Sequence, residues 1–218
     1  MRGLFLLSVL AAGLAVEEAA ADQAEVHAEG AFDTRVGLSR RSDVVLHNRA
    51  RVRVSNGNWY DVSLIPIYRY KVNNNLMLFG GSFFTWIRPA DSELSHSHVV
   101  RPFGGVEPSL HWERWSLAAR SGYERFLTID GPDYNRYRQR FRIIRRNGWT
   151  PYGNIELFWL NSGHCTTRYG TGFRRDFGKR DGIEFTYWYE TRKFTGGGIR
   201  HVFAVTFHLN FKGLAPDW

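Results

Sequence analysis

A row of arginines is the feature of the sequence best suited to chemistry. Residues 135–146 read NRYRQRFRIIRR, with an arginine at every second position over most of the segment. Side chains on a strand alternate between its two faces, so the spacing predicts a strand with four guanidinium groups on one surface. These four are Arg136, Arg138, Arg140 and Arg142. Nucleic acid, an anionic ligand, or carboxylates of the same protein would each suit such a row.

Acidic residues on the neighbouring segments favour carboxylates of the same protein. Glu124 precedes the row and Glu156 follows it, each at a position that shares the face of the arginines. A guanidinium binds a carboxylate through two parallel hydrogen bonds, and an unpaired ion in a narrow interior is costly. We therefore predict a charge network in the lumen of the fold. Its members are Arg120, Glu124, Arg136, Arg138, Arg140, Arg142, Glu156, Arg168, Arg174, Glu184 and Glu190.

Alternating apolar and polar residues, which are typical of strands, run through most of the chain. The pattern predicts an all-β fold with about ten strands, and twelve are compatible with it. The ten lie roughly at residues 42–54, 59–71, 76–87, 99–113, 115–129, 136–144, 152–160, 168–178, 183–194 and 200–211. Residues 22–39 are ambiguous, and a leader, a plug segment and an extra strand are all compatible with them.

The connections between these strands alternate in length. Short turns are expected at residues 73–75, 114, 147–148 and 179–182. Longer polar stretches, such as residues 89–98 and 161–167, separate the other strand pairs. This alternation is typical of an antiparallel up-and-down transmembrane β-barrel with short periplasmic turns and longer extracellular loops. An even number of strands would bring both termini to the periplasmic side.

The two faces of the strands differ as a membrane barrel requires. Along residues 203–211, Phe, Val, Phe, Leu and Phe alternate with Ala, Thr, His and Asn. Apolar side chains would face lipid and polar ones the lumen. Most of the 8 tryptophans fall near strand ends, where interfacial girdles would place them. A soluble sandwich or lipocalin-like barrel would have to bury the charged face in its core, which argues against that alternative.

The first 21 residues predict a secretory signal, followed by a barrel domain at residues 22–218. Arg2 precedes an apolar run, and Ala19 and Ala21 form a small-x-small cleavage site. The run is shorter than the roughly 20 residues of a transmembrane helix, and a buried N-terminal helix is the alternative. We expect export to the bacterial outer membrane. The expected partners are outer-membrane lipid, the barrel-assembly machinery and small anionic solutes, and not nucleic acid.

Other kinds of site have little support in the sequence. Cys165, which lies beside His164, is the one cysteine of the sequence. An internal disulfide and a multi-cysteine metal site are therefore excluded. Phosphate-binding glycine loops, zinc spacings and calcium loops are missing, so no cofactor or metal is predicted. The formal net charge of +8 suits nucleic acid, an anionic membrane surface or an acidic ligand, and does not choose among them.

Five motifs occur in a characteristic order: IYRYKVNNNLMLFGGSF, SLHWERWSLAARSGYERF, RYRQRFRI, NIELFW and TRYGTGF. In this order the chain resembles the DUF2490 outer-membrane barrels, a family of undetermined function, from about Arg49 to the C-terminus. The resemblance implies a barrel with a recurring set of charged lumen residues. These are Glu124, Arg136, Arg138, Arg140, Glu156 and Arg168.

Three functions are compatible with the sequence. The favoured one is a small outer-membrane barrel that is not an enzyme, serving as a narrow or anion-preferring pore or as a structural barrel. The second is a lipid-modifying enzyme of the phospholipase or lipid A deacylase type, with a nucleophile and a base from residues 95–98 or from Ser109 and His111. The third is a secreted polyanion-binding β-protein, which would carry its arginines on an exposed face away from carboxylates.

Overall fold

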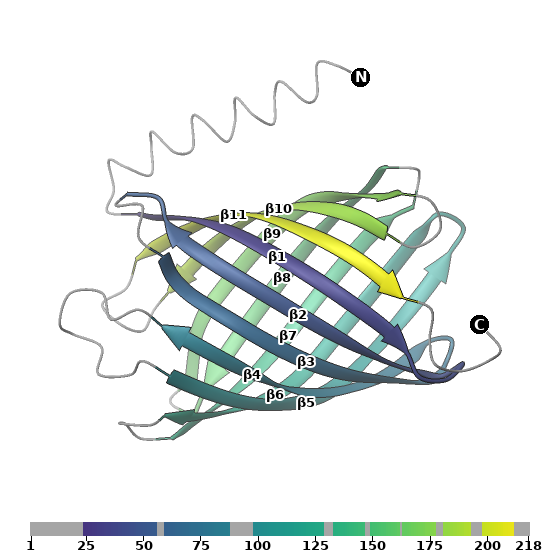
Figure 1. Ribbon diagram of the computed structural model, residues 1–218, viewed down its shortest axis with the longest axis horizontal. Coiled ribbons are helices and arrows are strands. Elements are labelled where there is room, and N and C mark those ends of the chain that lie inside the picture. The colour runs from purple at the N-terminus through teal and green to yellow at the C-terminus, as the bar shows by residue number, and fades with distance from the viewer. Residues whose placement is uncertain are drawn as a thin grey trace, which may run out of the picture.

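Eleven β-strands close into a single barrel in the computed structural model (Figure 1). The structure describes residues 24–55, 59–87, 98–128, 133–146, 149–161, 163–177, 181–192 and 198–211. The strands are β1 (Glu25–Gly37), β2 (Ser42–Arg53), β3 (Trp59–Asn73), β4 (Leu76–Ile87), β5 (His98–Trp112), β6 (Trp115–Thr128), β7 (Tyr134–Arg145), β8 (Trp149–Leu160), β9 (Gly163–Phe177), β10 (Asp181–Arg192) and β11 (Ile199–Phe211). The all-β, up-and-down barrel predicted from the sequence is confirmed.

The barrel closes through a parallel pair of strands. Each strand from β1 to β11 pairs antiparallel with the next, but β1 pairs parallel with β11, from Glu25 beside Arg200 to Val36 beside Phe211. Figure 1 shows β1 and β11 side by side with their arrowheads pointing the same way. Residues 25–37, left undecided by the sequence, are therefore an extra strand. The expectation of an even strand count is wrong. Because the number of strands is odd, β1 begins at one end of the barrel and β11 ends at the other.

The two ends of the barrel are named here by their connections. At the turn end, β3 joins β4 and β5 joins β6 through two residues each, whereas at the loop end residues 88–97 separate β4 from β5. The expected long loop at 161–167 is wrong, because β9 already begins at Gly163. Some predicted features lie outside the described residues. These are the signal segment 1–21, Ser95, His96, Ser97, the 147–148 turn and the side chains of His164 and Cys165.

The strand that carries the arginine row alternates as expected. Tyr137, Phe141 and Ile143 point outward and are 42–44% exposed. Gln139 is the polar exception on this outer face, and its amide oxygen accepts hydrogen bonds from the hydroxyls of Ser121 and Tyr137. These bonds compensate for polar atoms on an otherwise apolar surface. The described part of the chain contains no helix long and apolar enough to span a membrane.

Glycines let an aromatic ring lie flat on the inner wall. Phe79 on β4 lies beside Gly105 on β5, which in turn lies beside Gly122 on β6. A Cβ at position 105 would stand 2.1 Å from the carbonyl oxygen of Ser121 and 2.7 Å from the Phe79 ring. Glycine is therefore required here by a close approach of backbone and ring. The Arg120 guanidinium lies 4.7 Å above the same ring.

Candidate functional site

A cavity of about 650 Å³ occupies the inside of the barrel and receives side chains from all eleven strands. Thirteen arginines line it, against seven carboxylates. The lining reaches from Tyr134 and Val99 near the loop end to Arg35 and Arg174 near the turn end. The charged lumen is therefore the main chemical feature of the described residues.

The loop-side half of the arginine row is paired with carboxylates from the two adjacent strands. Arg136 donates from Nε and Nη2 to one oxygen of Glu124, at 2.9 and 2.6 Å. Arg138 donates to Glu156 at 2.5 Å and lies 3.7 Å from the second oxygen of Glu124. The antiparallel register explains this, since Glu124 faces Arg136 and Glu156 faces Arg140 across the ladder.

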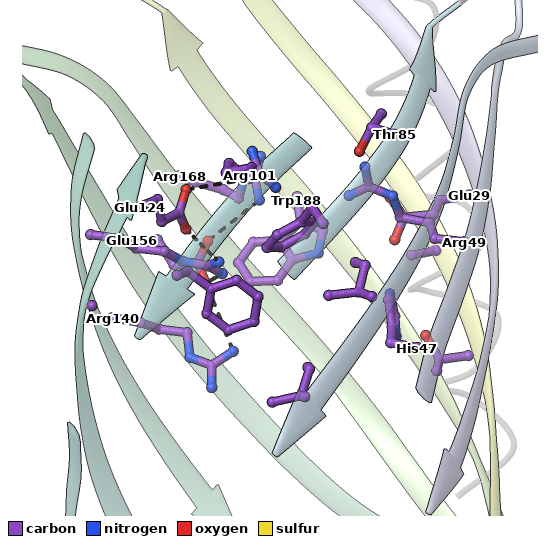
Figure 2. Close-up of a pocket in the computed structure, with 18 of the residues that line it drawn as sticks. Glu29, His47, Arg49, Thr85, Arg101, Glu124, Arg140, Glu156, Arg168 and Trp188 are labelled. Atoms are coloured by element: carbon purple, nitrogen blue, oxygen red, sulfur yellow. Dashed lines mark hydrogen bonds and ion pairs between the residues drawn. The ribbon is translucent and has the colours of Figure 1, made fainter. Parts of the chain in front are cut away.

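Glu156 is the centre of this network, and its side chain is 0% exposed. Besides Arg138, it accepts a hydrogen bond from Arg168 at 3.3 Å, and Arg168 also bonds to Glu190. Figure 2 shows Glu124, Glu156 and Arg168 together on one wall of the lumen. Because these side chains have little exposure to solvent, shared pairing offsets the cost of placing several ions close together.

The ring of Phe158 supports the cationic cluster. Its centroid lies 4.6 Å from the Arg136 guanidinium carbon, 5.5 Å from that of Arg138 and 5.4 Å from that of Arg168. Phe158 itself is buried. The negative face of an aromatic ring attracts cations, so this side chain both fills the interior and stabilises the arginines. Its place on the inward face was readable from the alternation of β8, but its contact with the three arginines was not.

The turn-side half of the row is held differently. Glu107 on β5, which was not among the predicted network residues, accepts a 2.5 Å hydrogen bond from Arg120. Arg142 reaches Glu184 on β10 at 3.4 Å, and Tyr152 donates to the same carboxylate at 2.6 Å. The contact from β7 to β10 bypasses two intervening strands. Arg142 and Glu184 therefore connect strands that are not adjacent in the barrel, in addition to the pairs between adjacent strands.

Arg174 was predicted to belong to the network but lies apart from it. Its Nε donates to Asp176 on the same strand at 2.6 Å, near the turn end. The Asp176 side chain is 52% exposed, so this pair lies at the rim of the lumen. The other predicted network residues make ion pairs deeper in the barrel.

A second charged cluster, whose pairs were not predicted from the sequence, covers the opposite wall. Arg51 donates to Glu29 at 2.8 Å, and Arg49 donates to Asp61 at 2.9 Å. Figure 2 shows Glu29 and Arg49 across the lumen from Glu124 and Glu156. The inward arginines of β2 were visible in the alternation. Their partner Glu29 lies on β1, whose strand character the sequence left open.

The closing seam between β1 and β11 carries its own polar contacts. Arg200 donates to Glu25 at 3.0 and 2.9 Å, so an ion pair crosses the seam near the loop end. Farther along, Asp33 is paired with His47 on one side and with His208, at 3.0 Å, on the other. The parallel strands are thus joined by side chains on the lumen face as well as by backbone bonds.

Of the proposed hydrolase groups, the structure describes His98, Ser109 and His111. Ser109 and His111 are 3.2 Å apart between Oγ and Nε2, near the turn end of β5. His98 begins the same strand, about 40 Å away at the usual rise of a strand. Among the described residues, no carboxylate is hydrogen-bonded to His111, so the orienting acid of a triad is missing there. The described residues also hold no group of three or more His, Cys, Asp or Glu placed to bind a metal.

Comparison with known families agrees with this geometry. The family described as "Protein of unknown function (DUF2490)" matches residues 30–200. The chain belongs to the DUF2490 family. The match begins within β1, earlier than the Arg49 expected from the motifs, and it contains every residue of the predicted charge network. No curated protein matches the chain.

Proposed function

We propose that this DUF2490 protein is an outer-membrane barrel whose charged lumen passes small anions. The observation that carries the proposal is the combination of an apolar outer face with a cavity lined by thirteen arginines and seven carboxylates. A soluble protein of this build would expose its apolar side chains to water and keep its charges inside. In a bilayer the same arrangement is favourable on both faces.

The outer face supports the membrane part of the proposal. Large apolar side chains stand 36–59% exposed around the barrel. Near the turn end they include Trp112, Trp115 and Trp149. The Arg145 guanidinium lies 5.6 Å from the Trp115 ring, and that of Arg175 lies 4.9 Å from the Trp149 ring. Tryptophans accompanied by cations at strand ends suit the headgroup region of a bilayer.

The excess of lumen arginines supports anion preference. Most carboxylates that contact the arginine row are already shared by two or three guanidiniums, as Glu156 is by Arg138, Arg140 and Arg168. The remaining positive charge favours the entry of anions over cations. The close packing of these side chains also makes the passage narrow. We therefore expect small solutes rather than oligomers to pass.

The test is the conductance of refolded protein in planar bilayers under a salt gradient. We expect small single-channel steps with a reversal potential that indicates anion preference. The Arg138→Ala, Arg140→Ala double variant should conduct more, because side-chain volume is removed, and should select less for anions. If neither protein conducts above background, the passage is refuted. Cation preference in the wild type would refute the role of the arginines.

Localisation has a separate test. The expressed protein should sediment with the outer membrane and migrate faster on a gel before boiling than after it. Recovery in the soluble periplasmic fraction, without this heat-dependent shift, would refute the membrane proposal and favour a secreted polyanion binder.

A further inference from the structure

Arg140 differs from the other arginines of the row in its bonding. It lies between Arg138 and Arg142 on the lumen face of β7 and directly opposite Arg120 on β6. Its ion-pair contacts are long, with 3.5 Å from Nη2 to Glu107 and 3.8 Å from Nη1 to Glu156. Good hydrogen bonds from nitrogen to oxygen are shorter than about 3.2 Å. Within the described residues, Arg136 and Arg138 donate short hydrogen bonds, Arg142 has 3.4 Å contacts with Glu184, and Arg140 has the longest contacts of the row.

The carboxylates near Arg140 are held by other arginines. Glu107 lies 2.5 Å from Arg120, a full ångström closer than it lies to Arg140. Glu156 lies 2.5 Å from Arg138 and 3.3 Å from Arg168. Arg140 therefore shares two carboxylates with three other arginines, so cations outnumber carboxylates at this position. Its side chain is 17% exposed, so water compensates for this only in part.

The Arg140 side chain lines the lumen cavity. Figure 2 shows the Arg140 guanidinium extending into the cavity below Glu156, away from Arg168 and Arg101. The whole cavity has a volume of about 650 Å³, more than a small oxyanion occupies. A guanidinium presents two parallel N–H groups, and this fork matches two oxygens of a phosphate or a carboxylate.

We propose that Arg140 is the centre of a binding site for a phosphate-class oxyanion, with Arg120 and Arg142 as its flanking cations. Inorganic phosphate and phosphate monoesters share this chemistry. A bound dianion would accept the hydrogen bonds that Glu107 and Glu156 leave unmade and would offset the local excess of positive charge. The proposal rests on the proposed function, because it requires a lumen that small anions can enter.

The test is titration of inorganic phosphate into refolded protein in a zwitterionic detergent at constant ionic strength, followed by calorimetry or by ³¹P line broadening. Wild-type protein should bind phosphate saturably. Arg140→Gln should weaken binding by about tenfold or more, the loss expected for one charged hydrogen-bonded contact. Arg174→Gln removes the same charge from the rim of the lumen and should retain wild-type affinity. Both variants must keep the heat-dependent gel shift, which reports the folded barrel.

Three outcomes would overturn this site. They are no saturable binding to the wild type, equal weakening in both variants, and unchanged affinity in Arg140→Gln. The conductance measurement separates this proposal from the proposed function. A barrel that conducts anions and binds no phosphate would overturn the site alone. Saturable phosphate binding that depends on Arg140, in a barrel that never conducts, would uphold the site and refute the passage.

Discussion

Individual buried charges in the lumen contribute to the free energy of unfolding of the barrel. Glu156 has no exposed side-chain surface and lies within 3.8 Å of Arg138, Arg140 and Arg168. Replacing it with glutamine would keep its size and leave three guanidiniums without their shared counter-charge. Loss of one partner from a buried ion pair costs about 3 kcal/mol or more. We expect Glu156→Gln to lower the free energy of unfolding by that amount, measured by denaturant titration in lipid vesicles with tryptophan fluorescence.

The control for this prediction is Asp176→Asn. Asp176 also pairs with an arginine, at 2.6 Å, but its side chain is 52% exposed. Exposed pairs contribute less than about 1 kcal/mol, so this variant should unfold close to the wild type. Equal losses in the two variants would mean that the depth of the pair in the lumen has no effect on its contribution.

At the residue scale, part of the network was predictable from sequence. Glu124 and Glu156 were recognisable because antiparallel neighbours share a face at every second position, and both contact the arginine row. Glu107 and Arg120 lie opposite each other in the β5–β6 hairpin, because Val106 pairs with Ser121 in the same register, so the short turn between these strands was the signal for this pair. The poorly bonded state of Arg140 depends instead on differences of about 1 Å, which no pattern encodes.

At the scale of the strands, the glycines of β5 offer a matched pair of substitutions. A Cβ at Gly105 would meet the Ser121 carbonyl oxygen at 2.1 Å, whereas at Gly104 the nearest atom is 3.6 Å away. Gly105→Ala should destabilise the barrel by about 2 kcal/mol, the usual cost of overpacking. Gly104→Ala should stay within about 0.5 kcal/mol of the wild type. The same unfolding titration measures both, and similar values for the two would contradict the close approach.

Strand prediction succeeded where apolar and polar residues contrast strongly. The bounds of β4 and the end of β11 match the expectation, and β2 is one residue shorter. β1 was not assigned because its outward face includes Ala28 and Gly30, which give little hydrophobic contrast. Its inward face carries the charged residues Glu29, Asp33 and Arg35. Charged residues opposite a face with few large apolar side chains, such as Phe32, are compatible with a leader or a plug as well as with a strand.

At the scale of the whole molecule, the proposed orientation in the membrane can be tested by labelling. Asn75 lies at the turn end and Asn161 at the loop end, and both are exposed. In a Cys165→Ser background, an impermeant maleimide should label Asn161→Cys in intact cells. It should label Asn75→Cys only after the outer membrane is permeabilised. The reverse order would invert the orientation, and equal labelling of both in intact cells would contradict a membrane-spanning barrel.

The overall architecture was predictable because every strand obeys the same two-face rule, so an error in one strand does not change the fold class. The number of strands was not predictable in the same way. It depends on residues 22–39, where the alternation of apolar and polar residues is weakest. Whether the termini lie at the same end depends in turn on that number. One undecided strand, β1, therefore changed the expected placement of the chain ends while leaving the barrel itself correctly predicted.

A barrel of consecutive antiparallel strands that closes through a parallel pair has an odd number of strands. This limits how the number of strands in such a fold can change. Adding or removing a hairpin changes the strand number by two, so no series of hairpin steps connects this barrel to an even-stranded one. Removal of β1 alone would do so, because β2 and β11 run in opposite directions and would meet as an ordinary antiparallel pair. That ten-stranded ring would lose Glu25, Glu29 and Asp33, which make the shortest ion pairs of Arg200, Arg51 and His47. β1 is thus both the strand that makes the count odd and the source of three acids that pair with lumen cations.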